Sequence, residues 1–424
     1  MKKISKIAII FAISLLQLNS ISFCDDIENE VIDVNAEIIS TENKRNEEMQ
    51  NTDQIKIPDI NSRAYVVIDR NTNTILCGKN ENEKRKMAST TKIMTATIII
   101  ENCNLNETIE ISKKAANTGG SRLGLKQNDK ITIKDLLYGL LLRSGNDAAV
   151  ALAEYAGGSI EGFAEMMNSK AKELNLNNTH FETPHGLDSD NHYTTAYELA
   201  TLANYALNNK TFKQIVGTKN YTITINGNPK NLTNTNELLG NLYGVYGIKT
   251  GFTNGANRCL VTACKRDNMD IICVVLGADT KKFRTQDSIK LINYVMNNFK
   301  QVNIEEIIDT KFKNWKNSNL YSFKINKGIS QNIEIFSDKL DYPYVPIRKD
   351  YINSITVTIN CKQQFNAPLH KNTEIGNISI AWNNKPQINL KIYNKNKIPK
   401  KKFYNYFTEL ISKYTEPLTY NNSF

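Results

Sequence analysis

Residues 88–95 read Ala88-Ser89-Thr90-Thr91-Lys92-Ile93-Met94-Thr95, and this stretch opens an apolar helix. Residues three apart on a helix share a face, so the Lys92 ammonium can reach the Ser89 hydroxyl. A serine hydroxyl becomes a good nucleophile only when a neighbouring base removes its proton, and a partly desolvated lysine can serve as that base. The helix N-terminus adds N–H groups that favour developing negative charge. Alone, this spacing is also typical of a capping or solvated serine.

Two later strings carry residue types that suit the same centre. Ser144-Gly145-Asn146 joins an apolar helix expected at Ile133–Leu142 to an Ala-rich helix expected at Asp147–Tyr155. Lys249-Thr250-Gly251 lies in an expected strand, Gly247–Phe252. Taken singly, the first string is an ordinary helix cap and the second an edge-strand feature. In this order, and each on the expected element, the three strings match the set typical of penicillin-binding proteins and β-lactamases.

The chain resembles the serine-type D-alanyl-D-alanine carboxypeptidases, which are low-molecular-mass penicillin-binding proteins with a β-lactamase-like fold. The resemblance covers roughly Ser62 to Phe299. Besides residues 88–95 it rests on three stretches: Arg143 to Ala149, Gly247 to Thr253, and the loop that contains Thr179-His180-Phe181 and Pro184-His185-Gly186-Leu187-Asp188.

The pattern of apolar residues predicts an α+β fold in which helices flank an antiparallel sheet. A strand, turn and strand are expected at 64–77, and two further strands at Arg258–Lys265 and Asp270–Gly277 are joined by a turn at Asp267-Asn268. Further helices are expected at Ile160–Leu174, Ala196–Leu207 and Thr285–Phe299.

The resemblance implies a two-step acyl transfer that needs no metal or cofactor. Ser89 would attack the peptide bond between two terminal D-alanines of a peptidoglycan stem peptide, with Lys92 as general base and Ser144 as proton relay to the leaving amine. Water would then hydrolyse the acyl-enzyme. β-Lactam antibiotics present a similar carbonyl and carboxylate, so they would acylate Ser89 and act as inhibitors.

The resemblance also assigns the groups that contact the substrate. Asn146 would orient the substrate amide and Lys92, while Gly251 would let the substrate backbone approach closely. The oxyanion would lie on the backbone N–H groups of Ser89 and Phe252. The substrate carboxylate would be bound by Lys249, Thr250 and Thr253.

Three other functions are alternatives to a carboxypeptidase. A serine β-lactamase shares Ser-x-x-Lys and Lys-Thr-Gly, but Glu173 and Glu182 do not match the loop of its deacylating glutamate, and Gly145 replaces the usual Asp. A D,D-endopeptidase would use the same residues. The β domain and terminal helix that we expect after residue 300 favour a carboxypeptidase. A non-catalytic cell-wall binding protein would need none of the three strings.

Two loops have a plain structural interpretation beside a functional one. His180, His185, Asp188 and His192 lie close in sequence and could suggest zinc, but they lack the helical spacing that places two ligands on one face, so a structural loop is favoured. A plain turn is the favoured account of residues Gly119 to Leu123, and a loop near the site is the functional alternative.

The chain of 424 residues, with 23% charged residues, is long enough for two or three folded domains. Lys2, Lys3 and Lys6 precede an apolar run, which predicts a signal peptide at 1–22 and hence a protein exported across the cytoplasmic membrane. We expect a flexible acidic linker at 23–57, a catalytic domain at 58–300, a β-rich domain at 301–398 and a tail at 399–424. The seven cysteines show no zinc spacing, and apolar surroundings favour buried free thiols, with one disulfide left open.

The tail predicts attachment to a surface. Residues 299–424 contain 19 basic and 10 acidic residues, which favours an anionic partner, and export argues against nucleic acid. An apolar stripe and adjacent lysines predict a helix lying on the outer face of the cytoplasmic membrane rather than one packed on the β domain. The stripe comprises Phe403, Phe407, Leu410, Ile411 and Tyr414, and the lysines are Lys400, Lys401, Lys402 and Lys413.

Overall fold

The computed structural model describes residues 32–40 and 56–415. The expected signal peptide at 1–22 lies outside these ranges. The chain divides into two compact units, Met1–Asn298 and Phe299–Phe424. The division therefore falls two residues before the predicted end of the catalytic domain.

The first unit is built on a five-stranded sheet in which every neighbouring pair of strands is antiparallel. The strand order is β2-β1-β9-β8-β7. The strands are β1 (Ala64–Asp69), β2 (Ile75–Lys79), β7 (Val245–Thr253), β8 (Asn257–Arg266) and β9 (Met269–Ala278). The predicted antiparallel sheet is thus confirmed, and the predicted turn Asp267-Asn268 joins β8 to β9.

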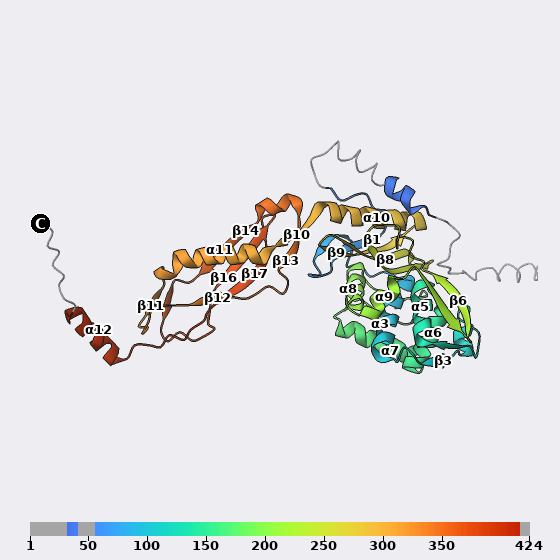
Figure 1. Ribbon diagram of the computed structural model, residues 1–424, viewed down its shortest axis with the longest axis horizontal. Coiled ribbons are helices and arrows are strands. Elements are labelled where there is room, and N and C mark those ends of the chain that lie inside the picture. The colour runs from blue at the N-terminus through green and yellow to red at the C-terminus, as the bar shows by residue number, and fades with distance from the viewer. Residues whose placement is uncertain (1–31, 41–55, 416–424) are drawn as a thin grey trace, which may run out of the picture. The chain divides into compact units, whose positions relative to one another are not determined.

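Helices cover both faces of this sheet (Figure 1). α10 (Lys281–Asn298) packs on one face, and the other helices gather on the opposite side. They are α3 (Lys92–Asn102), α4 (Lys113–Ala116), α5 (Ile133–Leu142), α6 (Asn146–Gly157), α7 (Ile160–Glu173), α8 (Ala196–Leu207) and α9 (Lys210–Val216). Two small antiparallel two-stranded sheets complete the unit: β3 (Thr108–Glu110) with β4 (Lys130–Thr132), and β5 (Asn220–Ile225) with β6 (Asn228–Thr233).

The central strands are apolar on both faces because both faces are covered. Ala64, Val66 and Ile68 of β1 belong to the main core between the sheet and the helices. Tyr65 and Val67, which alternate with them and so point to the other face, are buried as well. A sheet covered in this way fixes the position of β7, which carries the Lys-Thr-Gly string.

α10 begins one turn earlier than the sequence predicts, at Lys281 instead of Thr285. The Thr280 hydroxyl accepts a hydrogen bond from the Phe283 N–H at 3.1 Å, which caps the first turn. The pattern of apolar residues did not predict this first turn, because most of its residues are polar.

Part of the segment predicted to be a flexible linker is helical. Residues 34–40 form a short helix whose start is capped by the Asp33 carboxylate, 3.0 Å from the Asn35 nitrogen. Glu37 forms an ion pair with Lys282 at 3.3 Å and a hydrogen bond with Gln286, both on α10. These contacts attach the segment to the first unit. The sequence did not predict this helix, because it is too short to show a helical periodicity.

The second unit contains the predicted β domain. A four-stranded antiparallel sheet has the order β12-β17-β16-β14. The strands of this unit are β10 (Phe299–Asn303), β11 (Lys324–Asn326), β12 (Ile335–Ser337), β13 (Tyr344–Arg348), β14 (Thr356–Cys361), β15 (Gln364–Asn366), β16 (Glu374–Trp382) and β17 (Lys385–Asn394).

One helix of the second unit was not predicted. α11 (Ile304–Asn319) buries Ile304, Ile308 and Phe312, which recur every four residues and join the core of this unit. Its start is capped by Asn303, whose side chain accepts the Glu306 N–H at 3.1 Å. The expectation of a β-rich domain from residue 301 did not include this helix, which follows strand β10.

The predicted terminal helix is present as α12 (Phe403–Thr415). Its apolar stripe is exposed: 86% of Phe403, 55% of Phe407 and of Leu410, and 83% of Tyr414 are accessible to solvent. Within residues 32–40 and 56–415, no helix combines the length and apolar character needed to cross a bilayer.

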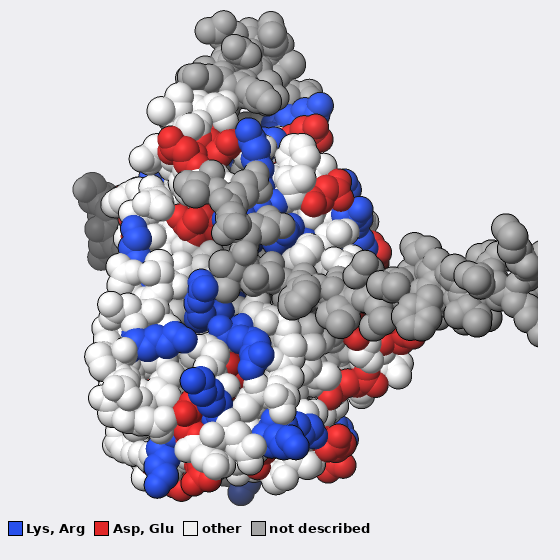
Figure 2. Space-filling view, turned by 90° about the vertical axis from the view of Figure 1, so that its right-hand side faces the viewer, with Lys and Arg blue, Asp and Glu red and all other residues white. Residues whose placement is uncertain are grey.

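The distribution of surface charge and the state of the cysteines are those of a typical folded protein. On the face drawn in Figure 2, basic and acidic side chains are interspersed among uncharged ones. The six cysteines in the described part of the chain are free thiols. Burial raises the pKa of Cys77 to about 12, so it behaves as a small apolar residue, as expected for these cysteines.

Candidate active site

Ser89 lies in a single 3-10 turn, Ala88–Thr91, that leads directly into α3. Thr90 and Thr91 donate their hydroxyl hydrogens to the carbonyl oxygens of Met87 and Ala88, at 2.6 and 2.8 Å. Ala88 has a φ of 50°, a conformation that costs energy for a residue with a side chain. These hydrogen bonds hold the strained turn, and Ser89 is left 7% exposed at its surface.

Lys92 is fully buried and its ammonium lies 2.8 Å from Ser89 Oγ. It also donates to Asn146 Oδ1 at 2.7 Å and to the His185 carbonyl oxygen at 3.0 Å. These three oxygens carry no formal charge. At 2.8 Å a proton can pass directly from the Ser89 hydroxyl to a neutral Lys92.

Ser144 lies in the turn between α5 and α6, Asn146 is the first residue of α6, and both are buried. Ser144 has a φ of 61°, so the turn is sharp at this residue. The Asn146 side chain donates from Nδ2 to the Gly119 carbonyl at 2.8 Å while its Oδ1 accepts from Lys92. One donor contact and one acceptor contact fix the orientation of this amide.

Asp147, which the sequence did not single out, supports this arrangement. Its buried carboxylate accepts hydrogen bonds from the backbone nitrogens of Leu123, Gly124 and Leu125 at 2.8, 2.7 and 3.0 Å. The Asn146 nitrogen also donates to the Ser121 carbonyl at 2.7 Å. The loop at 119–125 is therefore part of the wall of the site, as the sequence suggested for 119–123.

The Lys-Thr-Gly string brings β7 against the Ser89 turn. A β-carbon built on Gly251 would lie 3.1 Å from the backbone nitrogens of both Ser89 and Thr90, a spacing that real side chains seldom tolerate. Lys249 is 1% exposed and donates to the Thr250 carbonyl at 2.8 Å. Thr250 shares a hydrogen bond with Thr235, their hydroxyl oxygens lying 2.8 Å apart. The structure thus brings together the three strings that the sequence identified.

Thr253 and Phe252 have partners that the sequence did not predict. The Thr253 hydroxyl donates to Asp188 Oδ1 at 2.6 Å, and the Gly255 nitrogen donates to Asp188 Oδ2 at 2.8 Å. A hydroxyl has one hydrogen to give, so in this arrangement Thr253 holds the Asp188 loop rather than donating to a ligand. The Arg258 guanidinium lies 3.5 Å from the centre of the Phe252 ring.

The histidine loop packs against the Ser89 turn as a structural element. Gly186 has a φ of 86°, and a β-carbon there would lie 2.0 Å from the Ala88 carbonyl oxygen. His192 Nε2 lies 2.8 Å from the Thr91 hydroxyl, and its Nδ1 accepts the Glu182 N–H at 3.0 Å. Burial lowers the pKa of His192 to about 4 and that of His185 to about 3, so both rings are neutral.

These contacts agree with the structural interpretation of the histidines. His180 Nδ1 is engaged by the Asn191 carbonyl oxygen at 2.6 Å. Across the described ranges, no three His, Cys, Asp or Glu side chains are grouped so that they could hold a metal ion.

Comparisons with known proteins match both units. The family model described as D-alanyl-D-alanine carboxypeptidase matches residues 49–280, and the model of the penicillin-binding protein 5 C-terminal domain matches residues 315–400. D-alanyl-D-alanine carboxypeptidase DacF of Bacillus subtilis is 33% identical over 325 residues, which are 75% of this chain and 81% of that protein.

Solved structures give the same result for the fold. The D-alanyl-D-alanine carboxypeptidase DacD from Francisella tularensis has a TM-score of 0.68 and 25% identity, and the match covers 84% of this chain and 98% of that one. Penicillin-binding protein 5 from Haemophilus influenzae has a TM-score of 0.64 and 26% identity, covering 82% and 100%. The two-unit architecture is therefore shared with these structures.

Proposed function

The chain belongs to the D-alanyl-D-alanine carboxypeptidase family of serine peptidases. We propose that it removes D-alanine from peptidoglycan stem pentapeptides and that Ser89 is the residue that becomes acylated in this reaction. The chain is a serine hydrolase, and its assignment as a D-alanyl-D-alanine carboxypeptidase follows from the family and the relatives. The observation that best supports Ser89 and Lys92 in these roles is their 2.8 Å contact in a buried setting.

The acylation step uses the groups around Ser89. Its Oγ attacks the carbonyl carbon of the peptide bond between the two D-alanines, while Lys92 takes the hydroxyl proton. The C–N bond then breaks, and the leaving amine receives a proton that Ser144 passes on from Lys92. Free D-alanine departs, and the shortened peptide remains as an ester on Ser89.

Deacylation returns the enzyme to its starting state. Water attacks the ester carbonyl and gives a proton to Lys92, and that proton goes back to Ser89 Oγ as the C–O bond breaks. Asn146 supports both steps because its Oδ1 holds the ammonium of Lys92 at 2.7 Å. With that water, the groups of the chain and the peptide balance both steps.

The tetrahedral oxyanion is bound by the backbone N–H groups of Ser89 and Phe252. The missing side chain of Gly251 permits this geometry, since it lets β7 approach the Ser89 nitrogen. Losing one such donor typically lowers the rate by ~10²–10³. Lys249 supplies positive charge for the substrate carboxylate and Thr250 donates a hydrogen bond to it, which selects a free C-terminus.

The experiment that tests this proposal is labelling by a fluorescent penicillin combined with a D-alanine release assay. Stable labelling that disappears in Ser89→Ala, together with D-alanine release by the wild type, supports the proposal. Labelling that persists in Ser89→Ala contradicts the assignment of the nucleophile. Rapid turnover of the drug without D-alanine release points to a β-lactamase, and cleavage of cross-linked muropeptides as the main activity points to a D,D-endopeptidase.

The site of action is the outer face of the cytoplasmic membrane. The predicted signal peptide at 1–22 supports export. The exposed apolar stripe of α12, beside the exposed Lys400 and Lys402, supports peripheral attachment to an anionic lipid surface.

A further inference from the structure

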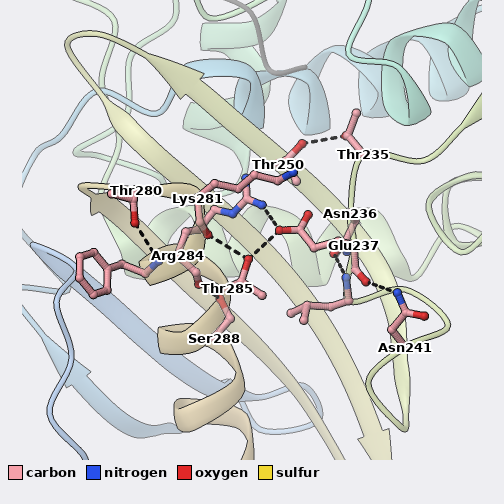
Figure 3. Close-up of polar contacts among 12 residues, drawn as sticks. Thr235, Asn236, Glu237, Asn241, Thr250, Thr280, Lys281, Arg284, Thr285 and Ser288 are labelled. Atoms are coloured by element: carbon pink, nitrogen blue, oxygen red, sulfur yellow. Dashed lines mark hydrogen bonds and ion pairs between the residues drawn. The ribbon is translucent and has the colours of Figure 1, made fainter. Parts of the chain in front are cut away.

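The loop between β6 and β7 connects the end of α5 to the Lys-Thr-Gly string through one residue, Thr235. Its backbone nitrogen donates to the carbonyl of Leu142, the last residue of α5, at 3.0 Å. Its hydroxyl oxygen lies 2.8 Å from that of Thr250 (Figure 3). Thr235 therefore bridges the end of the helix that leads to Ser144 and the strand that carries Lys249.

The following residues of the loop are attached to α10 by a buried ion pair. The Glu237 carboxylate pairs with Arg284 and accepts the Thr285 hydroxyl hydrogen at 2.6 Å (Figure 3). Arg284 is 3% exposed. Burial by itself raises the pKa of Glu237, but Arg284 and the Thr285 hydroxyl outweigh burial, and the pKa lies below its usual value. The carboxylate is thus charged at neutral pH.

The loop is also braced from within. Asn241 donates from its side chain to the Glu237 carbonyl oxygen at 2.8 Å, and the Asn236 side chain accepts the Leu238 N–H at 3.2 Å. Three buried polar atoms in the cluster have no hydrogen-bond partner among the described residues: Asn236 Nδ2, Glu237 Oε2 and Arg284 Nε. Such atoms make a buried ion pair costly for stability, which favours a role in positioning.

The number of hydroxyl hydrogens fixes the direction of the contact between the two threonines. A threonine hydroxyl has one hydrogen and two lone pairs. If Thr250 donates its hydrogen to a substrate carboxylate, it has none left for Thr235, so Thr235 must donate to Thr250. A hydrogen bond received by Thr250 also strengthens the one that it gives.

We propose that Thr235 is a positioning residue for carboxylate recognition: it donates to Thr250 and so points the Thr250 hydrogen at the C-terminal carboxylate of the substrate. The Glu237–Arg284 pair fixes the loop that carries Thr235. This inference rests on the proposed function, because it assigns Thr250 to the carboxylate of the departing D-alanine.

The test compares two substrates, an acyl-D-alanyl-D-alanine peptide and its C-terminal carboxamide. Thr235→Val keeps the shape of the side chain but removes the donor, and Thr235→Ser keeps the donor. For the carboxylate peptide we expect Thr235→Val to raise KM about tenfold with little change in kcat, because the hydrogen bond from Thr250 to the charged carboxylate is no longer directed by Thr235. Thr235→Ser should stay within about twofold of wild type.

A general disturbance of the site would affect both substrates, whereas the proposed role concerns only the carboxylate. Thr235→Val should therefore change the KM of the carboxamide by less than about twofold. The matched control is Thr222→Val on β5, where an exposed hydroxyl donates to Asn231 at 2.7 Å and the change should leave both substrates unaffected.

A second measurement tests the same role without the carboxamide, whose reaction can be too slow for its KM to be determined. In a Thr250→Val background, Thr235→Val should have no further effect on the KM of the carboxylate peptide, because the hydroxyl through which it acts is gone. Glu237→Gln should raise the same KM in the wild-type background and leave kcat largely unchanged. Melting temperatures verify that each variant is folded.

The outcomes separate this inference from the proposed function. A wild-type enzyme that releases no D-alanine contradicts the proposed function itself. An active wild type, with a Thr235→Val variant that keeps its KM or loses equally on both substrates, overturns only the role of Thr235. Additive effects of Thr235→Val and Thr250→Val would overturn it as well.

Discussion

Gly251 approaches Ser89 so closely that a β-carbon on Gly251 would lie 3.1 Å from the Ser89 backbone nitrogen. The same β-carbon would lie 3.1 Å from the Thr90 nitrogen, so both nearest neighbours are main-chain atoms. A flexible side chain could move aside, but the backbone of a hydrogen-bonded turn cannot do so without displacing the nucleophile. The glycine of this string therefore sets the spacing between β7 and Ser89.

Gly251→Ala should slow acylation by penicillin about tenfold or more, because even a small displacement of Ser89 misaligns the reacting atoms. The measurement is the second-order rate constant of fluorescent penicillin labelling, with the melting temperature as a check on the fold. Gly78→Ala on β2 is the control, since its nearest atom, also 3.1 Å away, is the end of the flexible Glu81 side chain. Equal labelling rates for Gly251→Ala and Gly78→Ala would contradict this account.

Lys92→Ala should reduce acylation by a factor of about 10²–10⁴, the usual contribution of a general base. Lys92 is the buried group that lies 2.8 Å from Ser89 Oγ. Penicillin labelling measures the effect, and circular dichroism verifies that the variant remains folded. A folded variant that labels at the wild-type rate would remove Lys92 as the base.

The three catalytic strings could be recognised in the sequence because each places reactive side chains on or beside a predicted helix or strand. Ser89 and Lys92 lie three residues apart at the start of a predicted helix, and Lys249 and Gly251 lie on a predicted strand. The sheet was predictable for the same reason: alternation and turn residues are local signals.

The supporting groups were not readable, since they act through contacts between residues far apart in sequence. Asp147 holds backbone nitrogens more than twenty residues away, and Thr235 meets Thr250 only because the loop between β6 and β7 folds back against β7. The contact that Lys92 makes with the His185 carbonyl has no sequence signal at all, because any residue has a carbonyl. α11 did carry a local signal, since Ile304, Ile308 and Phe312 recur every four residues, but the many polar residues between them obscured it.

The neutral histidines predict a loss of stability in acid. The pKa of buried His192 is lowered from 6.5 to about 4, so the unfolded chain binds more protons than the folded one between these values. The contribution of neutral His192, about 3 kcal/mol, is fully present above pH ~6.5 and is lost as pH falls towards ~4.

Denaturant unfolding between pH 7 and pH 4 measures this slope. Wild-type stability should fall over that interval, and His192→Gln should show a shallower fall because the titrating group is absent. The variant should also be less stable at pH 7, since the ring contacts Thr91 at 2.8 Å and packs edge-on against Phe181. An unchanged slope in His192→Gln would show that other groups cause the acid sensitivity.

Peripheral attachment by α12 predicts that membrane binding and catalysis separate. Deleting residues 399–424 should release active enzyme from membranes, because the site around Ser89 lies in the other unit. In the full chain, Phe407→Glu should weaken sedimentation with anionic vesicles by about tenfold or more, since it places a charge on the apolar face that we propose enters the lipid. Tyr321→Glu is the matched control, as Tyr321 is 84% exposed but lies outside α12. Sedimentation of the truncated chain at the full-length level, or equal losses for the two substitutions, would exclude α12 as the attachment surface.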